Sequence, residues 1–332
     1  MKQSRPISRL RRQLVASAPL AAFLASAGST YAQAGFPSRT IRLIVPWAPG
    51  GLVDTGARVL AEGFAPALGQ AAVVENIPGA AGTLGAAQVA KAPADGHTLL
   101  LGTSSIAIDI AGRRKMNLDP LRELTPVAMI SDSFSVIVVQ ASSPWQSLGD
   151  LLRAARAEPG KLSYGTPGIG SPAHLFSELL AQTAGLSMLH VPYGRSPAIN
   201  DLMGGQLSLM VATVPVAIPH IRSGRLRALA VTGTRRLSNL PEVPTAAEAG
   251  VAGYEASQWL GLFAPAGTPE TAIARLAAEV RRITAQPGNA KLLESRGLDP
   301  REGGPSELAQ ALRTDIGKWQ RVMDQAGIRL DA

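Results

Sequence analysis

Residues 40–54 have the sequence TIRLIVPWAPGGLVD, from which the type of fold can be predicted. Its first part, 40–46, is a β-branched apolar run that stops at Pro46, which predicts a buried strand. A glycine-rich turn follows at 46–51. Asp54 can then cap a helix that runs through about Leu68, because a short acidic side chain accepts from the amides of a helix start. A strand, a tight turn and a helix in this order are typical of an α/β protein.

The same alternation continues along the chain. Further strand-like runs lie at 73–75, 98–101, 136–139, 162–164, 189–191, 207–212, 227–231 and 260–264. Ser171 as cap, Pro172 in the first turn and Gly185 past the end delimit one helix between them. Two more helices begin at Thr268-Pro269 and near Ser306, and Gly327 ends the second. Apolar residues recur in both at helical spacing: Ile273, Leu276, Ala277, Val280 and Ile283, then Leu308, Leu312, Ile316, Trp319 and Met323. The alternation predicts mostly parallel sheets, and the chain is long enough for two.

Composition and charge narrow the class of protein. Of 332 residues 46% are hydrophobic and only 4% aromatic, so two cores can be filled, mainly with aliphatic side chains. The net charge of +8 is concentrated at the start: residues 1–34 hold five cations and no acid. The remainder has 27 basic against 24 acidic residues, and no basic run interleaved with aromatics. A nucleic-acid-binding surface is therefore not expected.

Residues 1–34 are predicted to be a signal peptide that is cleaved after Ala34. A basic segment ends at Arg12, an apolar stretch runs from Leu14 to about Ala27, and the small residues of Ala32-Gln33-Ala34 suit a signal peptidase. An uncleaved anchor is the alternative, although the stretch is short for a membrane span. Arg11-Arg12 leaves the export route open. The absence of cysteine excludes thiol catalysis and cysteine-ligated metals.

Three glycine-rich turns are candidates for binding an anion. They read PGGLVD (49–54), GAAGTLG (79–85) and GTPGIGS (165–171), and the first and third stand between a strand and a helix. A helix start has unpaired N–H groups and a partial positive charge, so it attracts carboxylate or phosphate. None of the turns matches the phosphate-binding or dinucleotide-binding patterns, which disfavours a nucleotide. The alternative for each is a tight turn that needs glycine only for its backbone.

At these turns the chain resembles the substrate-binding receptors of tripartite tricarboxylate transporters, also called Bug-type receptors. Five segments carry the resemblance, in the family's order: FPSRTIRLIVPWAPGGLVDTGAR (36–58), VVENIPGAAGTLGAAQVAKAPADGHTLLLGT (73–103), LSYGTPGIGSPAHLFSELL (162–180), HVPYGRSPAINDLMGGQLSLM (190–210) and GLFAPAGTPETAIARL (261–276).

The resemblance implies a two-lobed, periplasmic-binding-protein-like fold of type II. Lobe 1 would combine 35–135 with 248–332, lobe 2 would be 136–247, and two crossing segments would join them. A small carboxylate would lie in the cleft, held by the turns at 46–54 and 165–171, often through ordered water. We expect a monomeric periplasmic receptor, without cofactor or metal, that delivers its ligand to integral-membrane transporter subunits. A membrane signalling protein is the alternative recipient.

The predicted ligand-binding residues come from the turns and the helix starts beside them. They are Trp47, Ala48, Gly50, Gly51, Asp54, Thr103, Ser104, Ser105, Thr166, Gly168, Gly170, Ser171, His174, Tyr193, Ala198 and Asp201. Asp54 could face a ligand ammonium or only cap its helix, and Ser171 could likewise be only a cap. The hydroxyls at 103–105 could bind a carboxylate or satisfy nearby backbone. His174 could orient the turn by hydrogen bonding or touch the ligand.

One segment departs from the family pattern, and one other function stays open. The family's VPY-K-G-x-x-PA segment is a residue shorter here, at 191–198, so Arg195 could pair with a second ligand carboxylate or be a solvated charge. A secreted hydrolase is the less favoured alternative. The segment at 194–198 lacks the last glycine of G-x-S-x-G. The four histidines, at 97, 174, 190 and 220, form no metal-binding motif.

Overall fold

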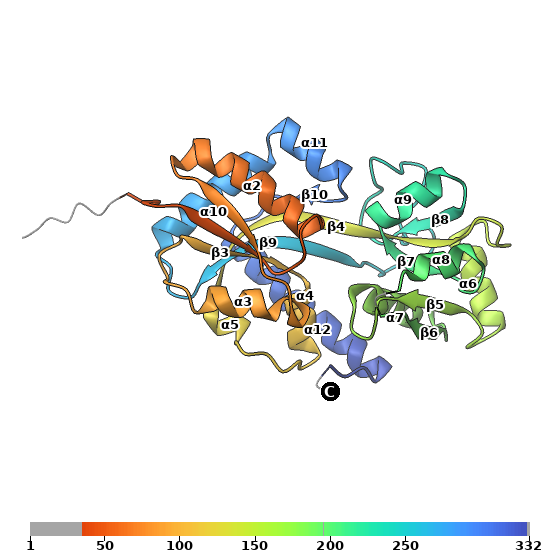
Figure 1. Ribbon diagram of the computed structural model, residues 1–332. Coiled ribbons are helices and arrows are strands. Elements are labelled where there is room, and N and C mark those ends of the chain that lie inside the picture. Colours follow the sequence, from red (N-terminus) through yellow and green to blue (C-terminus); the bar gives the residue numbers. More distant parts are fainter. Residues whose placement is uncertain (1–34, 195, 331–332) are drawn as a thin grey trace, which may run out of the picture.

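The computed structural model describes residues 35–194 and 196–330, so the predicted signal peptide and Arg195 lie outside the described residues. Two lobes lie one beside the other along the long axis of the molecule (Figure 1). The strand β4, Leu124–Gln140, runs from lobe 1 into lobe 2, and the chain returns to lobe 1 at β9, Ser257–Pro265. Among the described residues, none of the helices has the length and apolar character that a membrane crossing requires.

Lobe 1 is built on a sheet with the strand order β10-β4-β9-β3-β1-β2. Its other strands are β1 (Ile41–Val45), β2 (Ala72–Asn76), β3 (Thr98–Thr103) and β10 (Asp299–Pro300). β1 pairs in parallel with β2 and β3, whereas β9 is antiparallel to both β3 and β4. The helices of this lobe are α2 (Leu52–Leu68), η2 (Ala80–Gly82), α3 (Thr83–Ala90), α4 (Ser105–Ala111), α5 (Pro120–Glu123), α10 (Glu270–Thr284) and α11 (Pro287–Ser295).

Lobe 2 continues the same sheet on the second part of β4. There β7 (Met210–Thr213) and β8 (Leu226–Val231) both pair with β4 in antiparallel fashion. β5 (Ser163–Thr166) and β6 (Leu189–Pro192) form a parallel pair beside them. The helices are α6 (Leu148–Ala157), α7 (Pro172–Ala184), α8 (Ala198–Met203) and α9 (Val214–Arg222).

The last helix, α12 (Pro305–Ala326), is a third connection between the lobes. It packs against α4 of lobe 1 and α7 of lobe 2. The ring of Phe176 on α7 stacks on Trp319 of α12 with 5.4 Å between centroids, and the Gln182 amide donates to the Val322 carbonyl over 2.9 Å. Closing or opening the lobes must therefore either carry α12 along or shift these contacts.

Strand directions bring the carboxyl ends of both lobes face to face. In lobe 1, Thr103 at the end of β3 pairs with Leu260, close to the point where β9 enters from lobe 2. β1 runs parallel to β3, so both strands end toward lobe 2. In lobe 2, β7 runs against β4 and therefore toward lobe 1. A parallel bridge from Tyr164 to Leu209 gives β5 the direction of β7, and β6 shares it.

The prediction of mostly parallel sheets is wrong. Pairs that include β4 or β9 are all antiparallel, and these two strands occupy the centre of the sheet. The run at 124–135 was not predicted as a strand, because polar Ser131, Asp132 and Ser133 interrupt its apolar pattern. Conversely, the strand expected at 207–212 begins only at Met210. Ser131 and Ser133 are nevertheless buried within β4.

The predicted helix ends and apolar faces are confirmed. Ser171 is the N-cap of α7, with its hydroxyl accepting from the His174 amide, and Gly185 and Gly327 end α7 and α12 in the left-handed conformation. On α10 the residues Ile273, Leu276, Val280 and Ile283 are buried, with Ala277 packed beside them. This face fills one core of lobe 1 together with β1 and α2.

We expect Leu276→Ala to lower the free energy of unfolding by about 2–5 kcal/mol, since it removes a fully buried side chain and leaves a cavity. Leu292→Ala on α11, where the side chain is 42% exposed, is the matched control and should cost far less. Urea denaturation monitored by circular dichroism measures both. Equal losses in the two variants would contradict the assignment of the α10 face to the core.

Candidate functional site

The turn after β1 is held in shape by Asp54. Its carboxylate is buried and accepts four hydrogen bonds: from the Gly50 amide (3.0 Å), twice from the Arg58 guanidinium (2.8 and 3.2 Å) and from the Asn76 amide group (3.0 Å). A carboxylate has about four lone-pair sites, so Asp54 is saturated within the protein. The prediction that it caps α2 is wrong, because Gly51 is the N-cap and Asp54 lies in the first turn.

The Arg58 hydrogen bonds, aided by those from Gly50 and Asn76 and opposed by burial, lower the pKa of Asp54 to about 2. At neutral pH the carboxylate is therefore charged and fixes the turn. Gly50 has a φ of 84°, a left-handed conformation that glycine adopts without strain. Its amide points back to Asp54, so the glycine serves the turn and not directly an anion.

Trp47 is fixed by two neighbours. Its carbonyl accepts from the Asn76 amide group over 3.1 Å. On its other side, a Cβ at Gly82 would lie 3.4 Å from the indole, so the turn at 79–85 packs closely on the ring. Ala48, Gly50 and Gly51 are exposed in the same turn. The second glycine-rich turn thus supports the first.

The turn after β3 places two hydroxyls beside Trp47. Thr103 and Ser105 share a hydrogen bond of 2.6 Å, and both line a small cavity that Trp47 also lines. Ser104 is buried and its amide donates to the Trp259 carbonyl over 3.2 Å. The Ser104 hydroxyl has no partner among the described residues. The structure thus brings together Trp47, Thr103 and Ser105, whereas Ser104 faces the interior.

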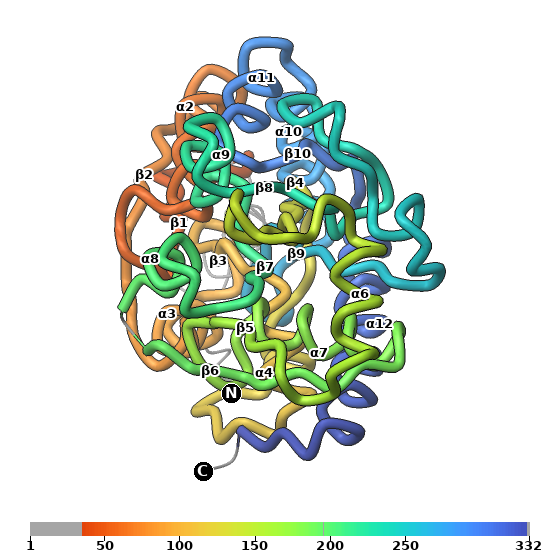
Figure 2. Tube along the Cα trace, turned by 90° about the vertical axis from the view of Figure 1, so that its right-hand side faces the viewer, coloured from red at the N-terminus to blue at the C-terminus, as the bar shows by residue number. Residues whose placement is uncertain are grey.

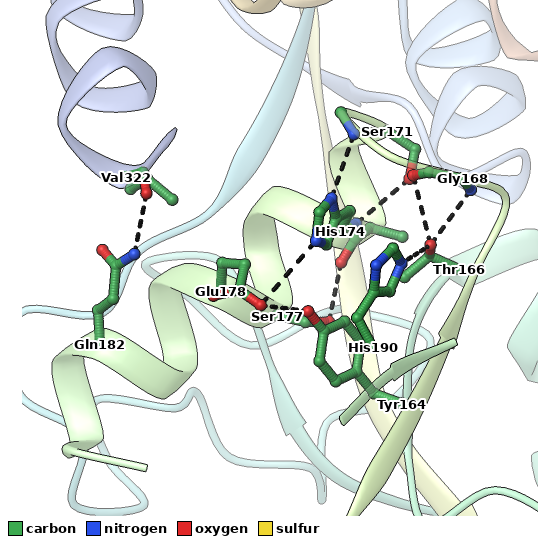
Figure 3. A network of polar contacts seen from close by, with 12 residues as sticks. Tyr164, Thr166, Gly168, Ser171, His174, Ser177, Glu178, Gln182, His190 and Val322 are labelled. Atoms are coloured by element: carbon green, nitrogen blue, oxygen red, sulfur yellow. Dashed lines mark hydrogen bonds and ion pairs between the residues drawn. The ribbon is translucent and has the colours of Figure 1, made fainter. Parts of the chain in front are cut away.

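In lobe 2, Thr166 at the end of β5 holds the following turn in shape through hydrogen bonds. Its buried hydroxyl lies 2.6 Å from His190 Nε2 and accepts from the Gly168 amide over 3.2 Å (Figure 3). Gly170 donates its amide to His174 Nδ1 over 3.1 Å. The amides of Gly168 and Gly170, which we predicted as carboxylate contacts, therefore already have partners inside the turn.

His174 orients this turn, one of the two roles we considered for it. Only 4% of the residue is exposed, and its ring stacks on His190 with 3.8 Å between centroids and 11° between planes. Burial, with the neighbouring His190 as a second cause, lowers the pKa of His174 to about 4. Burial also lowers the pKa of His190. A neutral His174 keeps Nδ1 free to accept from Gly170.

Tyr164 and Glu178 complete the same cluster. The Tyr164 hydroxyl donates to Glu178, whose carboxylate lies 3.9 Å from His174 Nε2. The Tyr164 ring also stacks on His190, with centroids 5.1 Å apart. Burial raises the pKa of Tyr164, so its hydroxyl stays protonated. No local pattern marks Tyr164, His190 or Glu178 in the sequence. The register of β5 against β6 places Tyr164 beside His190, and α7 brings Glu178 to them.

The remaining predicted residues of lobe 2 gather beside Thr166. The Tyr193 amide donates to the Thr166 carbonyl (2.9 Å), and the Tyr193 hydroxyl donates to Asp201 (2.7 Å). Burial and the Asp201 carboxylate raise the pKa of Tyr193 to about 12. Ala198 is buried, and a Cβ at Gly165 would lie 3.1 Å from it. Ala198 is therefore a packing residue, whereas Tyr193 and Asp201 are partly exposed.

Leu330 was missed by the sequence analysis and joins the two lobes. Its amide donates to the Gly112 carbonyl at the end of α4, over 3.3 Å. A Cβ at Gly112 or Gly170 would lie 2.4 or 2.3 Å from its side chain, so both glycines are needed for this contact. The side chain of Leu330 thus packs between lobe 1 and the turn of lobe 2. A side chain at position 170 would therefore disturb the packing of Leu330, so a substitution of Gly170 cannot test ligand binding alone.

The family of the protein follows from its similarity to known proteins. A family model described as the tripartite tricarboxylate transporter family receptor matches residues 56–328. The chain belongs to this receptor family. The family consists of solute-binding receptors and not of enzymes. No group of three or more His, Asp or Glu side chains within 35–194 and 196–330 is placed to hold a metal ion.

Relatives of this receptor resemble it over nearly their whole length. The "UPF0065 protein in tcbD-tcbE intergenic region" of Pseudomonas sp. (strain P51) is 40% identical, covering 94% of each chain. BugT of Bordetella pertussis is 34% identical over 93% of this chain and 96% of its own. Among solved structures, Rpa4515 of R. palustris with adipate has a TM-score of 0.75 at 35% identity, covering 89% of this chain and 99% of that one.

A second solved relative of the receptor is MatC (Rpa3494) from Rhodopseudomonas palustris with bound malate. It has a TM-score of 0.71 at 34% identity and covers 86% of this chain and 99% of its own. These matches confirm the predicted fold class, a two-lobed α/β protein of the periplasmic-binding type.

We expect Asp54→Asn to lower the free energy of unfolding at pH 7 by about 1–2 kcal/mol. This value is smaller than the pKa shift alone implies, because Arg58 is exposed and solvent screens its interaction with Asp54. Because the pKa is lowered on folding, the charge stabilises the receptor above the unfolded value of 3.8, and this contribution disappears as the pH falls toward 2. Urea titrations from pH 3 to 7 measure the difference. Glu62→Gln, on the exposed face of α2, is the control; a loss as large there would contradict the argument.

The histidine pair predicts a second pH dependence. Because His174 has a lower pKa in the folded receptor than the unfolded value of 6.5, the unfolded chain binds the proton first. Its contribution should reduce stability as the pH falls from about 6.5 to 4, by up to about 3 kcal/mol. His174→Asn keeps an acceptor for Gly170 and should flatten this slope, whereas His220→Asn on α9 should not. An unchanged slope in His174→Asn would show that His174 titrates normally.

Proposed function

We propose that the protein is a periplasmic receptor that binds a small organic acid between its lobes and delivers it to integral-membrane transporter subunits. Membership of the receptor family supports binding and location in the periplasm. Relatives of similar length carry adipate and malate, which supports a carboxylate ligand. We further propose that the lobes divide at 35–135 with 248–332 and at 136–247.

The observation that carries this proposal is the opposed arrangement of strand ends. β1 and β3 end toward lobe 2, and β5, β6 and β7 end toward lobe 1. In open α/β sheets, ligands bind outside the carboxyl ends of strands. Helices α2 and α7 begin at these ends, so the positive ends of two helix dipoles border the same space.

The amides of Gly50, Gly168 and Gly170 donate within their own turns and are not available to a carboxylate. The available groups are the amides of Gly51, Leu52, Val53 and Ala173, at the starts of α2 and α7, where the helix offers no acceptor. The hydroxyls of Thr103 and Ser105 can complete the set. A hydrogen bond to a charged acceptor contributes about 1.5–3 kcal/mol once water is excluded.

A ligand held by both lobes stabilises the closed arrangement over the open one. The transporter could then distinguish loaded from empty receptor by the relative position of its lobes. β4 and the segment leading to β9 would act as the hinge. Ser131 and Ser133 are buried near the crossing point. Their hydroxyls have no hydrogen-bond partner among the described residues, so a hinge motion there would break no hydrogen bond of these two side chains.

Residues 35–332 should gain thermal stability with a small carboxylate, because ligand that binds only the native state raises the melting midpoint. Differential scanning fluorimetry against mono-, di- and tricarboxylates, amino acids and aromatic acids tests this. We expect a graded, saturable shift for at least one acid. No shift across the whole panel would refute the proposed function.

A charge placed in the lobe 2 turn tests the location of the site. Ile169 is 60% exposed, so Ile169→Asp should fold normally but repel the ligand carboxylate, weakening binding at least tenfold, or about 1.4 kcal/mol. Leu189→Asp, at 56% exposure on the opposite end of lobe 2, should leave affinity unchanged. Calorimetric titration with the acid found above gives both values. Equal affinities would remove the turn at 165–171 from the site.

A further inference from the structure

The segment that follows α12 reaches the lobe 2 turn at which the proposed function places the ligand. Gly327 ends α12 in the left-handed conformation, with a φ of 67°, and the Ile328 amide donates to the Met323 carbonyl over 2.9 Å. This hydrogen bond is typical of the Schellman motif, which fixes the direction in which a chain leaves a helix. The direction of the last described residues is therefore set by α12, which packs against both lobes.

Leu330 packs between two glycines, one from each lobe, and only 8% of it is exposed. Gly112 ends α4 in lobe 1, and Gly170 lies in the turn that precedes α7 in lobe 2. A Cβ at Gly112 would lie 2.4 Å from Leu330 Cδ1 and 2.5 Å from its Cγ, and a Cβ at Gly170 would lie 2.3 Å from its Cδ2. Side chains do not approach so closely, so Leu330 fits only because both positions lack one.

The lobe 2 turn has one support from its own lobe and one from Leu330. Within lobe 2, the Gly170 amide donates to His174 Nδ1 over 3.1 Å. The three heavy atoms nearest to a Cβ at Gly170 all belong to Leu330, so the C-terminal segment, and not lobe 2, covers this side of the residue. The next residue back, Ile169, is 60% exposed. Leu330 thus supports the turn directly beside its most exposed apolar side chain.

We propose that Leu330 is a positioning residue for ligand binding, which holds the turn at 165–171 in place against the end of α4. α4 begins at Ser105, whose hydroxyl is among the groups available to a carboxylate, so Leu330 contacts both elements that border the ligand. A turn that is already held in place loses less conformational freedom when the acid binds. This inference rests on the proposed function, since it assumes that the acid lies between these elements.

A leucine that only fills the core would have a different effect when it is removed. Truncation of an ordinary core leucine lowers stability, and the side chains around it relax into part of the space. Gly112 and Gly170 have no side chains with which to fill the space that Leu330 would leave. The turn would then lose its contact with the C-terminal segment and become free to move. The effect of truncation on the turn therefore distinguishes the two roles.

Hydrogen exchange of residues 35–332 without any acid tests the support of the turn. Leu330→Ala should speed the exchange of amides at 165–175 at least tenfold, as followed by mass spectrometry. Leu68→Ala is the matched control, because Leu68 is also 8% exposed and packs in a core of lobe 1 at the end of α2. It should lower the melting midpoint and leave exchange at 165–175 unchanged. Unchanged exchange in Leu330→Ala, or equal acceleration in both variants, overturns the inference.

A second variant displaces Leu330 without removing it. Gly112 has a φ of −80°, which alanine adopts without strain, but the Cβ of Gly112→Ala must push Leu330 aside. Gly112→Ala should therefore speed exchange at 165–175. When it is combined with Leu330→Ala, the collision is relieved, and exchange should be no faster than in Leu330→Ala alone. Additive effects of the two substitutions would show that they act independently, and would contradict the inference.

Isothermal titration with succinate, adipate, citrate, glutamate and benzoate measures the consequence for binding. For each of these acids that binds the wild type, Leu330→Ala should weaken binding about tenfold, and Leu330→Met, which restores most of the lost volume, should recover most of the affinity. Leu68→Ala should stay within twofold of the wild type. Equal affinities of the wild type and Leu330→Ala overturn the inference and leave the receptor function intact. If the wild type binds no acid of the whole fluorimetry panel, the proposed function fails and the inference with it.

Discussion

The 17-residue strand β4 fixes the direction of the strands in both lobes. Its first part pairs with β9 in lobe 1 and its second part with β7 and β8 in lobe 2, always in antiparallel fashion. One continuous backbone therefore orients β1 and β3 toward lobe 2 and β5 and β6 toward lobe 1. Viewed along the long axis (Figure 2), β5, β6 and β7 lie in front of the lobe 1 strands. The opposition of the two sets of strand ends is a consequence of this pairing.

The turns at those ends are shaped by side chains that a ligand need not touch. Asp54 and Asn76 fix the first turn, and Thr166, His174 and His190 fix the other. Turns whose own amides are satisfied keep their shape when the cleft is empty. The ordering cost of binding is thereby reduced, which favours affinity for a small ligand. The amides left over are those of the helix starts, where the backbone cannot satisfy them.

Much of the fold could be predicted from the sequence, because strand runs, caps such as Ser171 and glycines such as Gly185 are local signals. The antiparallel direction of the central strands could not be predicted. The polar residues of β4 interrupt the apolar pattern by which the strand would be recognised, and its direction depends on pairing with strands that are distant in sequence. For the site, the turns at 46–54 and 165–171 were correctly associated with strand ends. The roles of Asp54, Gly50 and Gly170 were not predictable, because they depend on Asn76, His174 and Leu330, which are distant in sequence or reach the turn only after folding.

The distance between the lobes, with and without ligand, tests the account most directly. The sequence has no cysteine, so Gln88→Cys on α3 and Asn200→Cys on α8 can be spin-labelled selectively. Both positions are exposed, and α3 and α8 lie on the same side of the long axis in Figure 2. Electron–electron double resonance should show a shorter and narrower distance distribution when a saturating acid is added. An unchanged distribution at full occupancy would contradict closure of the opposed strand ends on the ligand.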